Sequence, residues 1–575
     1  MNGGERIARV LAERGVTELY TLCGGHISPI LVEARRAGIR VTDVRDEATA
    51  VFAADATARL TGIPGVAAVT AGPGLTNTIT AVKNAQLAQS PVLVLGGATA
   101  TALKGRGALQ DIDQRPLMAP HVKFARVVKR ARDLAPAVAE ALEAACSGVP
   151  GPVFVECPVD LLYDEEVVRG WYGQGRPAGA SLAERATAWY LEWHTRRLFA
   201  HAERMPPPAA PVEPRAPGRE AIATVAGHLE AAKRPVMVVG SQALVHAGRA
   251  EEIRYAVERI GIPVYLSGMA RGLLGASHRL LFRHRRRDAI KAADLVILAG
   301  VPCDFRLDYG RQIRRDARLV GFNLSAHDLR LNRRPTDPVQ ADPGSCILAL
   351  AEAMRGRPSE REDWLAELRE RDDAREADSD ARASAGGEGV TPLRLCREID
   401  AVLPEESVLV ADGGDFVGTA SYIVRPRGPL RWLDPGAFGT LGVGGGFAIG
   451  AARARPGSEV WLLYGDGSVG YSLIEFDSYV RHGLAPIAIV GNDACWAQIA
   501  REQVKLLGDD TGVKLARTDY HLAAEGLGGA GIVVRRDDEI PEALARARAL
   551  SAQGRPVLVN VQLAETDFRE GSLSI

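Results

Sequence analysis

Short apolar runs alternate with helical patterns along most of this chain. In its last third, an apolar run at 460–464 leads into Gly-Asp-Gly-Ser, a helical segment follows, and a second apolar run at 485–490 ends at Gly-Asn-Asp. Strands of parallel sheets have this continuous apolar character, and a strand–helix–strand unit crosses over with a right hand. We therefore expect both loops at the carboxyl edge of one parallel sheet, the edge at which open α/β sheets bind ligands.

The same alternation recurs in two earlier stretches, and it predicts α/β domains with parallel sheets. We place a first domain at 1–165, a middle domain at 219–355 and a third domain with a C-terminal tail at 390–575. The stretch 166–218 combines an amphipathic aromatic segment, predicted to be a docking helix, with a Pro-rich run, so it is read as a linker. The charged and then Gly-rich stretch 356–389 is read as a second linker.

Composition narrows the class of protein. A net charge of −1 with 25% charged residues gives no electrostatic footprint for nucleic acid or for an anionic membrane. Seven cysteines without a C-x-x-C pair argue for a reducing compartment and against zinc or a disulfide framework. Glu5 and Arg6 precede any apolar core, so no signal peptide is expected, and the longest uncharged stretches are too rich in Gly, Thr and Pro to span a membrane. We expect a cytoplasmic protein.

The two loops of the last third carry the strongest chemical signal. Asp466 and Asp493 would supply carboxylate oxygens to Mg²⁺, which keeps few protein carboxylates and completes its shell with phosphate oxygens. Gly465 and Gly467 let the backbone approach a diphosphate closely and direct N–H groups at it. Each loop alone could be an ordinary turn. Their occurrence together, each after a buried-strand pattern, favours a metal and phosphate site.

These motifs resemble those of the thiamine-diphosphate enzymes. In that family a GDG motif is followed, 27 positions after its Asp, by the second residue of an Asn-Asn or Asn-Asp pair, and Asp466 and Asp493 have this spacing. The resemblance implies that thiamine diphosphate and Mg²⁺ bind here, with the backbone carbonyl of Cys495 as third protein ligand and Ser468 in the diphosphate loop. It also implies the fold, which is three Rossmann-like parallel-sheet domains: pyrimidine-binding, middle and diphosphate-binding.

A Gly-rich stretch around Leu441 resembles the family segment that shapes the cofactor. By this resemblance Leu441 wedges between the two cofactor rings and bends them into a V, while the backbone of Gly439 accepts a hydrogen bond from the 4′-amino group. Asp412, Gly413 and Gly414 would belong to the same cofactor-binding surface. A core leucine among packing glycines explains Leu441, but not so many adjacent glycines.

The first domain carries the expected catalytic acid. Glu47 lies where a strand ends and a helix begins, a place where a carboxylate can simply complement the helix dipole. Its segment resembles the family segment whose glutamate binds N1′ of the aminopyrimidine, which turns the 4′-imino group into the base that activates the thiazolium. Similar segments place Gln110 and His26 over the thiazolium. For His26 the alternative is a loop histidine with one backbone hydrogen bond.

The reaction is indicated by the helix after the metal loop. Acetolactate synthases resemble this chain over most of its length, but their Met-Val pair and Trp are replaced here by Gln498, Ile499 and Glu502. Gln498 and Glu502, at i and i+4, share one helix face. Segments such as GNDACWAQIAREQV and TDFREGS are more similar to the 2-hydroxyacyl-CoA lyases. That resemblance implies reversible cleavage of a 2-hydroxyacyl-CoA to formyl-CoA and an aldehyde or ketone, with Glu502 as the proton-shuttling base. An exposed helical Glu beside Arg501 is the alternative.

The sequence says less about which residues would bind the nucleotide end of the substrate. The middle domain resembles one that holds FAD in acetolactate synthases and the nucleotide end of coenzyme A in acyl-CoA enzymes, so FAD or ADP there stays open. Arg271, the basic run 283–287 and Arg569 in the tail are candidate contacts for a CoA thioester, since arginines bind phosphate well. A solvated charged face is the alternative for the run, and the tail is either a lid over the site or a disordered end.

Three further expectations follow from the resemblance. Family members join the pyrimidine and diphosphate sites across two subunits, so a homo-oligomer is expected, a dimer at minimum and a tetramer in the usual case. The N-terminal membrane segment of a similar protein has no counterpart in this sequence, so we expect no membrane partner. A pyruvate carboligase with FAD and a non-catalytic thiamine-diphosphate binding protein are the rival functions, and the joint presence of Glu47, Asp466 and Asp493 argues against the second.

Overall fold

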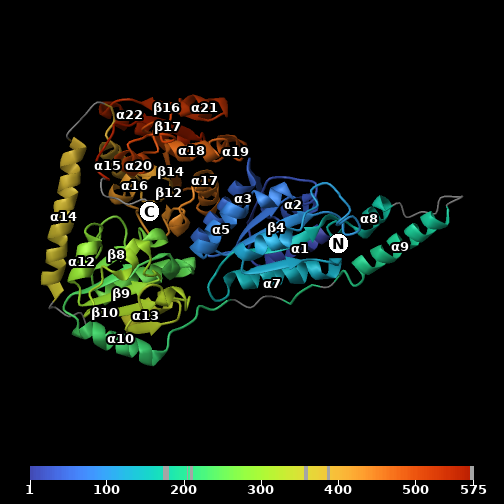
Figure 1. Ribbon diagram of the computed structural model, residues 1–575, viewed down its shortest axis with the longest axis horizontal. Coiled ribbons are helices and arrows are strands. Elements are labelled where there is room, and N and C mark those ends of the chain that lie inside the picture. The colour runs from blue at the N-terminus through green and yellow to red at the C-terminus, as the bar shows by residue number, and fades with distance from the viewer. Residues whose placement is uncertain (173–180, 204, 208–211, 355–360, 385–388, 570–575) are drawn as a thin grey trace. The chain divides into compact units, whose positions relative to one another are not determined.

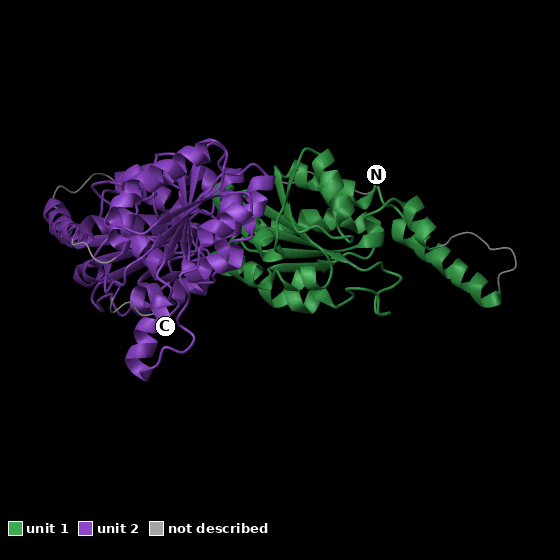
Figure 2. Cartoon of the chain, turned by 90° about the horizontal axis from the view of Figure 1, so that it is seen from above, with its two compact units in different colours: residues 1–212 green, residues 213–575 purple. Residues whose placement is uncertain are grey.

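The computed structural model describes residues 1–172, 181–203, 205–207, 212–354, 361–384 and 389–569. The chain forms two compact units, 1–212 and 213–575 (Figure 2). The described residues form three sheets, one in the first unit and two in the second, and every paired strand in them is parallel. The chain therefore has the predicted architecture of three α/β domains with parallel sheets.

The first unit contains a six-stranded sheet in the order β2-β1-β3-β4-β6-β5, with helices on both faces (Figure 1). Its strands are β1 (Glu18–Thr21), β2 (Arg40–Asp43), β3 (Gly65–Val69), β4 (Val92–Ala98), β5 (Phe124–Val127) and β6 (Val153–Pro158). Its helices are α1 (Gly3–Glu13), α2 (Ser28–Arg36), α3 (Glu47–Thr61), α4 (Pro73–Thr76), α5 (Ile79–Ala88), α6 (Gln114–Met118), α7 (Leu134–Cys146), α8 (Glu165–Trp171) and α9 (Leu182–Phe199).

Helix α9 is the amphipathic aromatic segment predicted from the sequence. A capping box at Ser181 and Glu184 starts it, and Thr195 and Leu198 are its buried residues. Trp189 and Trp193 remain exposed on the opposite side.

The middle sheet, in the second unit, has five strands in the order β11-β10-β9-β7-β8. Its strands are β7 (Pro235–Val239), β8 (Val264–Leu266), β9 (Leu295–Ala299), β10 (Arg318–Phe322) and β11 (Asp337–Val339). The accompanying helices are α10 (Arg219–Ala231), α11 (Ala250–Ile260), α12 (Arg286–Ala292), α13 (Pro343–Ala353) and α14 (Glu362–Ser384). Figure 1 shows the long helix α14, drawn in yellow, running alongside both sheets of this unit.

The last sheet has six strands in the order β13-β12-β14-β15-β17-β16. Its strands are β12 (Ser407–Asp412), β13 (Trp432–Leu433), β14 (Glu459–Gly465), β15 (Ile487–Asn492), β16 (Ala530–Val534) and β17 (Val557–Gln562). Its helices are α15 (Pro392–Val402), α16 (Gly414–Ile423), α17 (Val443–Ala454), α18 (Asp466–Ser472), α19 (Glu475–Arg481), α20 (Ala497–Leu507), α21 (Tyr520–Gly526) and α22 (Ile540–Ala552).

The apolar runs that predicted strands lie in the cores. Strands β12, β14 and β15 are buried along almost their whole length, and alternate residues on one face of this sheet, such as Leu463 and Ile489, belong to one hydrophobic core cluster. The Gly-rich motif at 526–531 fits the letters of a dinucleotide fingerprint, but it follows a helix and precedes a strand: it connects α21 to β16 as a turn. Among the described residues, no helix is long and apolar enough to cross a membrane.

Candidate active site

The carboxyl ends of β14 and β15 hold the two candidate metal carboxylates. The strands are adjacent and in register, with Gly465 opposite Gly491. Helix α18 begins at Asp466, and Asp493 directly follows β15, so the two aspartates stand at the same sheet edge. One oxygen of Asp466 accepts from the Gly467 amide at 2.8 Å, and one oxygen of Asp493 accepts from the Cys495 amide at 3.1 Å. The strand–helix–strand geometry expected from the sequence is therefore present.

The surroundings of Asp466 and Asp493 disfavour the charged form of both carboxylates. Burial raises the pKa of Asp466 to about 6, against the opposing effect of nearby amides that include those of Ala494 and Cys495. Burial, followed by the nearby charge of Asp466, raises the pKa of Asp493 to about 7. The second oxygen of Asp466 is buried and accepts no hydrogen bond from the described residues. A partnerless buried oxygen next to a second carboxylate is what a divalent cation would stabilise.

The donor set fits magnesium with one backbone ligand. No three His, Cys, Asp or Glu side chains form a metal-binding cluster within the described ranges. Mg²⁺ prefers oxygen ligands and keeps few carboxylates, so the two aspartates and the Cys495 carbonyl match its preference. The thiol of Cys495 is poorly suited to the task, because burial and the nearby Asp493 raise its pKa.

Asp412 holds the Gly-rich turn that presents Leu441. Its fully buried carboxylate accepts hydrogen bonds from the amides of Gly442 at 3.1 Å and Gly444 at 2.7 Å, at the start of α17. Burial raises its pKa to about 7 although these amides oppose the shift. The Asp412 side chain is thus occupied with the backbone, and it positions the turn before α17.

Leu441 presses against the backbone of Gly413. A Cβ atom at Gly413 would lie 2.0 Å from Cδ2 of Leu441, so a side chain there would displace Leu441. The Ser468 hydroxyl donates to the carbonyls of Asp412 and Gly465, which ties the diphosphate loop to the end of β12. The backbone at Gly439 has φ 65° and open space where a side chain would be. Of the glycines predicted to form the cofactor surface, Gly413, Gly414 and Gly465 lie against one another at this sheet edge.

In the first unit, three predicted residues gather around the loop that follows β3. Glu47, at the start of α3, is buried and accepts a hydrogen bond from the Asn77 amide group at 3.1 Å. His26 Nδ1 lies 3.1 Å from the Thr70 hydroxyl, and burial lowers the pKa of His26, which favours a neutral ring. Gln110 has φ 62° and packs its backbone against Gly72.

Thr70 and Asn77 were not singled out from the sequence. Both belong to the loop at 70–77 that follows β3, and their partners, His26 and Glu47, are distant in the chain. Thr70 contacts His26 through its hydroxyl, and Asn77 fixes the Glu47 carboxylate. The signal available in the sequence was the presence of two polar side chains in a loop after a buried strand.

Helix α20 carries Gln498 and Glu502, and it has no buried residue. Both side chains are half-buried. Arg501 does not pair with Glu502; it forms an ion pair with Asp415, with 2.6 Å between Nη2 and Oδ1. In the part of the chain that the structure describes, the Glu502 carboxylate has neither a hydrogen-bond nor an ion-pair partner. It is therefore available to accept a proton.

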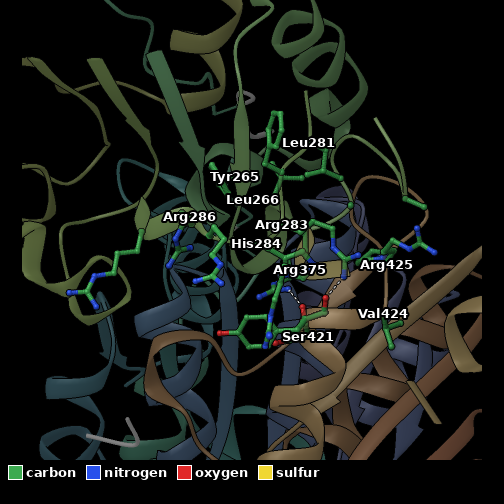
Figure 3. Close-up of a pocket in the computed structure, with 18 of the residues that line it drawn as sticks. Tyr265, Leu266, Leu281, Arg283, His284, Arg286, Arg375, Ser421, Val424 and Arg425 are labelled. Carbon is green, nitrogen blue, oxygen red and sulfur yellow. Dashed lines mark hydrogen bonds between the residues drawn. The ribbon is translucent and has the colours of Figure 1, made fainter. Parts of the chain in front are cut away.

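A cavity of about 1070 Å³ in the second unit is lined by positive charge (Figure 3). We call it the arginine cavity. Its walls come from the middle sheet, the loop before α12 and the end of α16, and Asp288 is the one acid among the described lining residues. Its cationic side chains are Arg271, Arg283, Arg285, Arg286, Arg287, Lys291, Arg375, Arg425 and Arg569.

The basic run 283–287 is only partly a solvated face. Arg283 donates to Glu376 at 3.0 Å, and burial lowers its pKa to about 10. Arg286 donates to the carbonyl of Arg306 at 2.6 Å. Arg271 donates to the carbonyl of Ser421 at 2.7 Å and lies 5.2 Å from the ring centre of Trp432. The cavity is thus a built site with cations held in place by the protein.

Comparison with known proteins gives consistent matches. Family models for the thiamine pyrophosphate enzyme match in three parts: the N-terminal TPP binding domain at residues 1–117, the central domain at 222–350 and the C-terminal TPP binding domain at 412–561. The chain is 50% identical to "2-hydroxyacyl-CoA lyase 2" of Danio rerio, over 100% of this chain and 93% of that protein. It is also 50% identical to the protein of that name in Homo sapiens, over 100% and 92%. An acetolactate synthase large subunit of Mycobacterium tuberculosis is 35% identical, over 98% and 95%.

Proposed function

Because this chain belongs to the thiamine pyrophosphate enzymes, we propose that it is a thiamine-diphosphate- and magnesium-dependent carbon–carbon lyase. Its substrate is a 2-hydroxyacyl-CoA, and its products are formyl-CoA and an aldehyde or ketone. The arginine cavity is the observation that supports the CoA part of this proposal, since a nucleotide with several phosphates is the kind of ligand that nine cationic side chains attract.

The cofactor would be held by residues that already form a matching surface. Asp466, Asp493 and the carbonyl of Cys495 would bind Mg²⁺, and the Gly465–Ser468 turn would face the diphosphate. Leu441 and Gly439 would hold the two rings. When bound, thiamine diphosphate supplies a nucleophilic carbon and an electron sink for the charge left when a carbon–carbon bond breaks.

The chain's own residues move the protons. Glu47 would donate a hydrogen bond or proton to N1′, and Asn77 keeps its carboxylate in a fixed orientation. Glu502 would take the proton from the substrate's 2-hydroxyl group as the bond between C1 and C2 breaks, and would return it to the formyl carbon. Neutral His26 can donate or accept a hydrogen bond near the reacting carbonyl without adding charge. Gln498, on the same face of α20 as Glu502, would contact the substrate.

The rival is a pyruvate carboligase of the acetolactate synthase type, with FAD in the middle domain. The match to a mycobacterial acetolactate synthase supports relatedness, but at 35% identity against 50% for the lyases. By the resemblance of the α20 segment, Glu502 would also replace a bulky Trp of those enzymes. A carboxylate suits proton transfer to a 2-hydroxyl group better than it suits a hydrophobic wall for a ketoacid.

Product analysis tests the proposal. Purified protein is incubated with a short and a long 2-hydroxyacyl-CoA, with thiamine diphosphate or Mg²⁺ omitted in turn, and with pyruvate plus FAD in a parallel reaction. We expect formyl-CoA only when both cofactors are present. Acetolactate from pyruvate, with stoichiometric FAD and no formyl-CoA, would contradict the lyase assignment.

We also infer a homo-oligomer, a dimer at minimum and a tetramer in the usual case. The pyrimidine-binding and diphosphate-binding parts of the family site lie on different domains, and family members join these parts across two subunits. Light scattering behind a sizing column measures this directly. A monomer that turns over substrate would contradict it.

A further inference from the structure

Asp415 is a buried carboxylate that is not among the proposed metal ligands. It lies in the first turn of α16, three residues after Asp412, and it is 8% exposed. Its Oδ1 atom lies 2.6 Å from Arg501 Nη2 and 3.8 Å from Arg569 Nε. A buried carboxylate between two guanidinium groups is an organised contact, because burying either charge alone would be costly.

Arg501 connects this carboxylate to α20. It lies one residue before Glu502 and three after Gln498, and its Nη1 atom donates to the carbonyl of Arg569 at 3.1 Å. Arg501 therefore binds two partners that are far from it in sequence, one on α16 and one in the tail.

The rest of α20 offers little to hold it. An amphipathic helix is normally fixed by an apolar face packed on the core. None of the residues of α20 is buried, and Ile499, Leu506 and Leu507 are 49%, 75% and 76% exposed. Its apolar side chains therefore contribute little to its position, and the Arg501–Asp415 ion pair is the most buried of its polar contacts.

The C-terminal tail also contacts α16, the helix that carries Asp415. A Cβ atom at Gly418 would lie 1.9 Å from Nη1 of Arg569, so the glycine at this position of α16 makes room for that side chain. The Arg569 guanidinium lies 5.6 Å from the ring centre of Tyr422, and Phe568 packs edge-on against the same ring at 6.3 Å. Asp415 thus lies under both α20 and the last described residues of the tail.

We propose that Asp415 is a positioning residue that fixes α20 through Arg501, so that Glu502 and Gln498 keep their places in the site. The chemical consequence rests on the proposed function of Glu502, whereas the ordering of α20 can be measured in the cofactor-free protein. A purely structural role would instead predict that loss of Asp415 weakens the whole domain evenly.

Hydrogen exchange on the cofactor-free protein tests whether Asp415 holds α20 in place. In Asp415→Asn we expect peptides from α20 to exchange about tenfold faster, while peptides from β14 and α18 keep their rate. Glu459→Gln is the matched control, because Glu459 also holds an arginine, Arg548, through three contacts of 2.9–3.1 Å, but at the other end of β14. The control should leave α20 exchange unchanged.

Kinetics test the consequence. With cofactors bound, Asp415→Asn should lower kcat for lyase turnover about tenfold or more, with KM and the Mg²⁺ half-saturation within about threefold. Asp415→Glu, which keeps the charge, should recover part of the loss. Arg501→Gln tests the same link from the helix side, and it serves if Asp415→Asn does not fold.

Unchanged α20 exchange in both variants, or faster exchange spread evenly over the domain, would overturn the proposal. So would a loss of kcat that follows a loss of Mg²⁺ affinity, because the charge of Asp415 also acts on Asp493. If α20 loosens as expected but the wild-type protein cleaves no 2-hydroxyacyl-CoA, the lyase assignment fails while the positioning of α20 stands.

Discussion

Replacing Asp466 with Asn separates metal binding from folding. Burial raises the pKa of Asp466 from 3.8 to about 6 in the metal-free protein. The folded state therefore binds this proton more tightly than the unfolded state does. The contribution of Asp466 to the free energy of unfolding is greatest below pH 3.8, falls as the pH rises from 3.8 to about 6, and stays at the lower level above that. The amide of Asn is uncharged and nearly isosteric with the carboxyl group, so it removes the free-energy cost of burying a charged carboxylate at this position.

The size of the effect follows from the same values. One pKa unit corresponds to about 1.4 kcal/mol, so a rise from 3.8 to about 6 corresponds to about 3 kcal/mol at pH 8. The second oxygen of Asp466 has no hydrogen-bond partner among the described residues, so an amide placed there meets the same surroundings as the protonated acid. We expect Asp466→Asn to stabilise the metal-free protein by about 3 kcal/mol at pH 8, by about half of that at pH 5, and to abolish Mg²⁺ binding.

Denaturant titrations in a chelator at pH 5 and pH 8 measure the stability, and calorimetry with thiamine diphosphate and Mg²⁺ measures the binding. Asp509→Asn is a suitable control, because Asp509 is exposed and hydrogen bonds from Thr511 lower its pKa. That variant should gain no stability at pH 8. The reasoning is refuted if Asp466→Asn is no more stable than the wild type at pH 8, or if it still binds Mg²⁺.

Four further changes test other parts of the account. Glu502→Gln should keep Mg²⁺ and cofactor binding in calorimetry but lower kcat by about 10²-fold or more, and near-wild-type turnover would remove Glu502 from the mechanism. Glu47→Gln should lower kcat similarly while leaving Mg²⁺ affinity within about threefold, since Glu47 is not among the proposed metal ligands. Leu441→Ala should weaken cofactor binding or kcat about tenfold without changing Mg²⁺ affinity, and an unaltered enzyme would show that no wedge is needed. Arg286→Gln should raise KM about tenfold for the CoA thioester but not for the same acyl group on a pantetheine thioester, and equal effects on both would place the phosphates elsewhere.

Much of the fold was predictable because buried strands of a parallel sheet appear in the sequence as continuous apolar runs. The apolar runs at 460–464 and 485–490 became β14 and β15, and the aromatic segment at 182–199 became α9. The edge strands β5 and β13 were not distinguished, since β5 is only half-buried and β13 has two residues. Short or half-exposed strands lack the continuous apolar pattern on which the prediction depends.

The part of the candidate site that could be predicted is the part whose residues are linked by one local strand–helix–strand unit. Asp466 and Asp493 are joined by one crossover unit, so their position at one sheet edge follows from the pattern. The contact of Asp415 with Arg501 joins residues 86 positions apart on different helices, and no local pattern indicates it. The burial of Arg283 likewise depends on Glu376, which belongs to another helix. Such contacts are set by tertiary packing.

The most direct test of the central claim follows the carbon that is removed. The protein, with thiamine diphosphate and Mg²⁺, is given a 2-hydroxyacyl-CoA labelled with carbon-13 at C1, and the products are identified by mass. We predict labelled formyl-CoA and, in equal amount, an unlabelled aldehyde or ketone one carbon shorter, both lost in Asp466→Asn. Label that stays in the intact acyl-CoA, or product formation that survives without Mg²⁺ and thiamine diphosphate, would contradict the account.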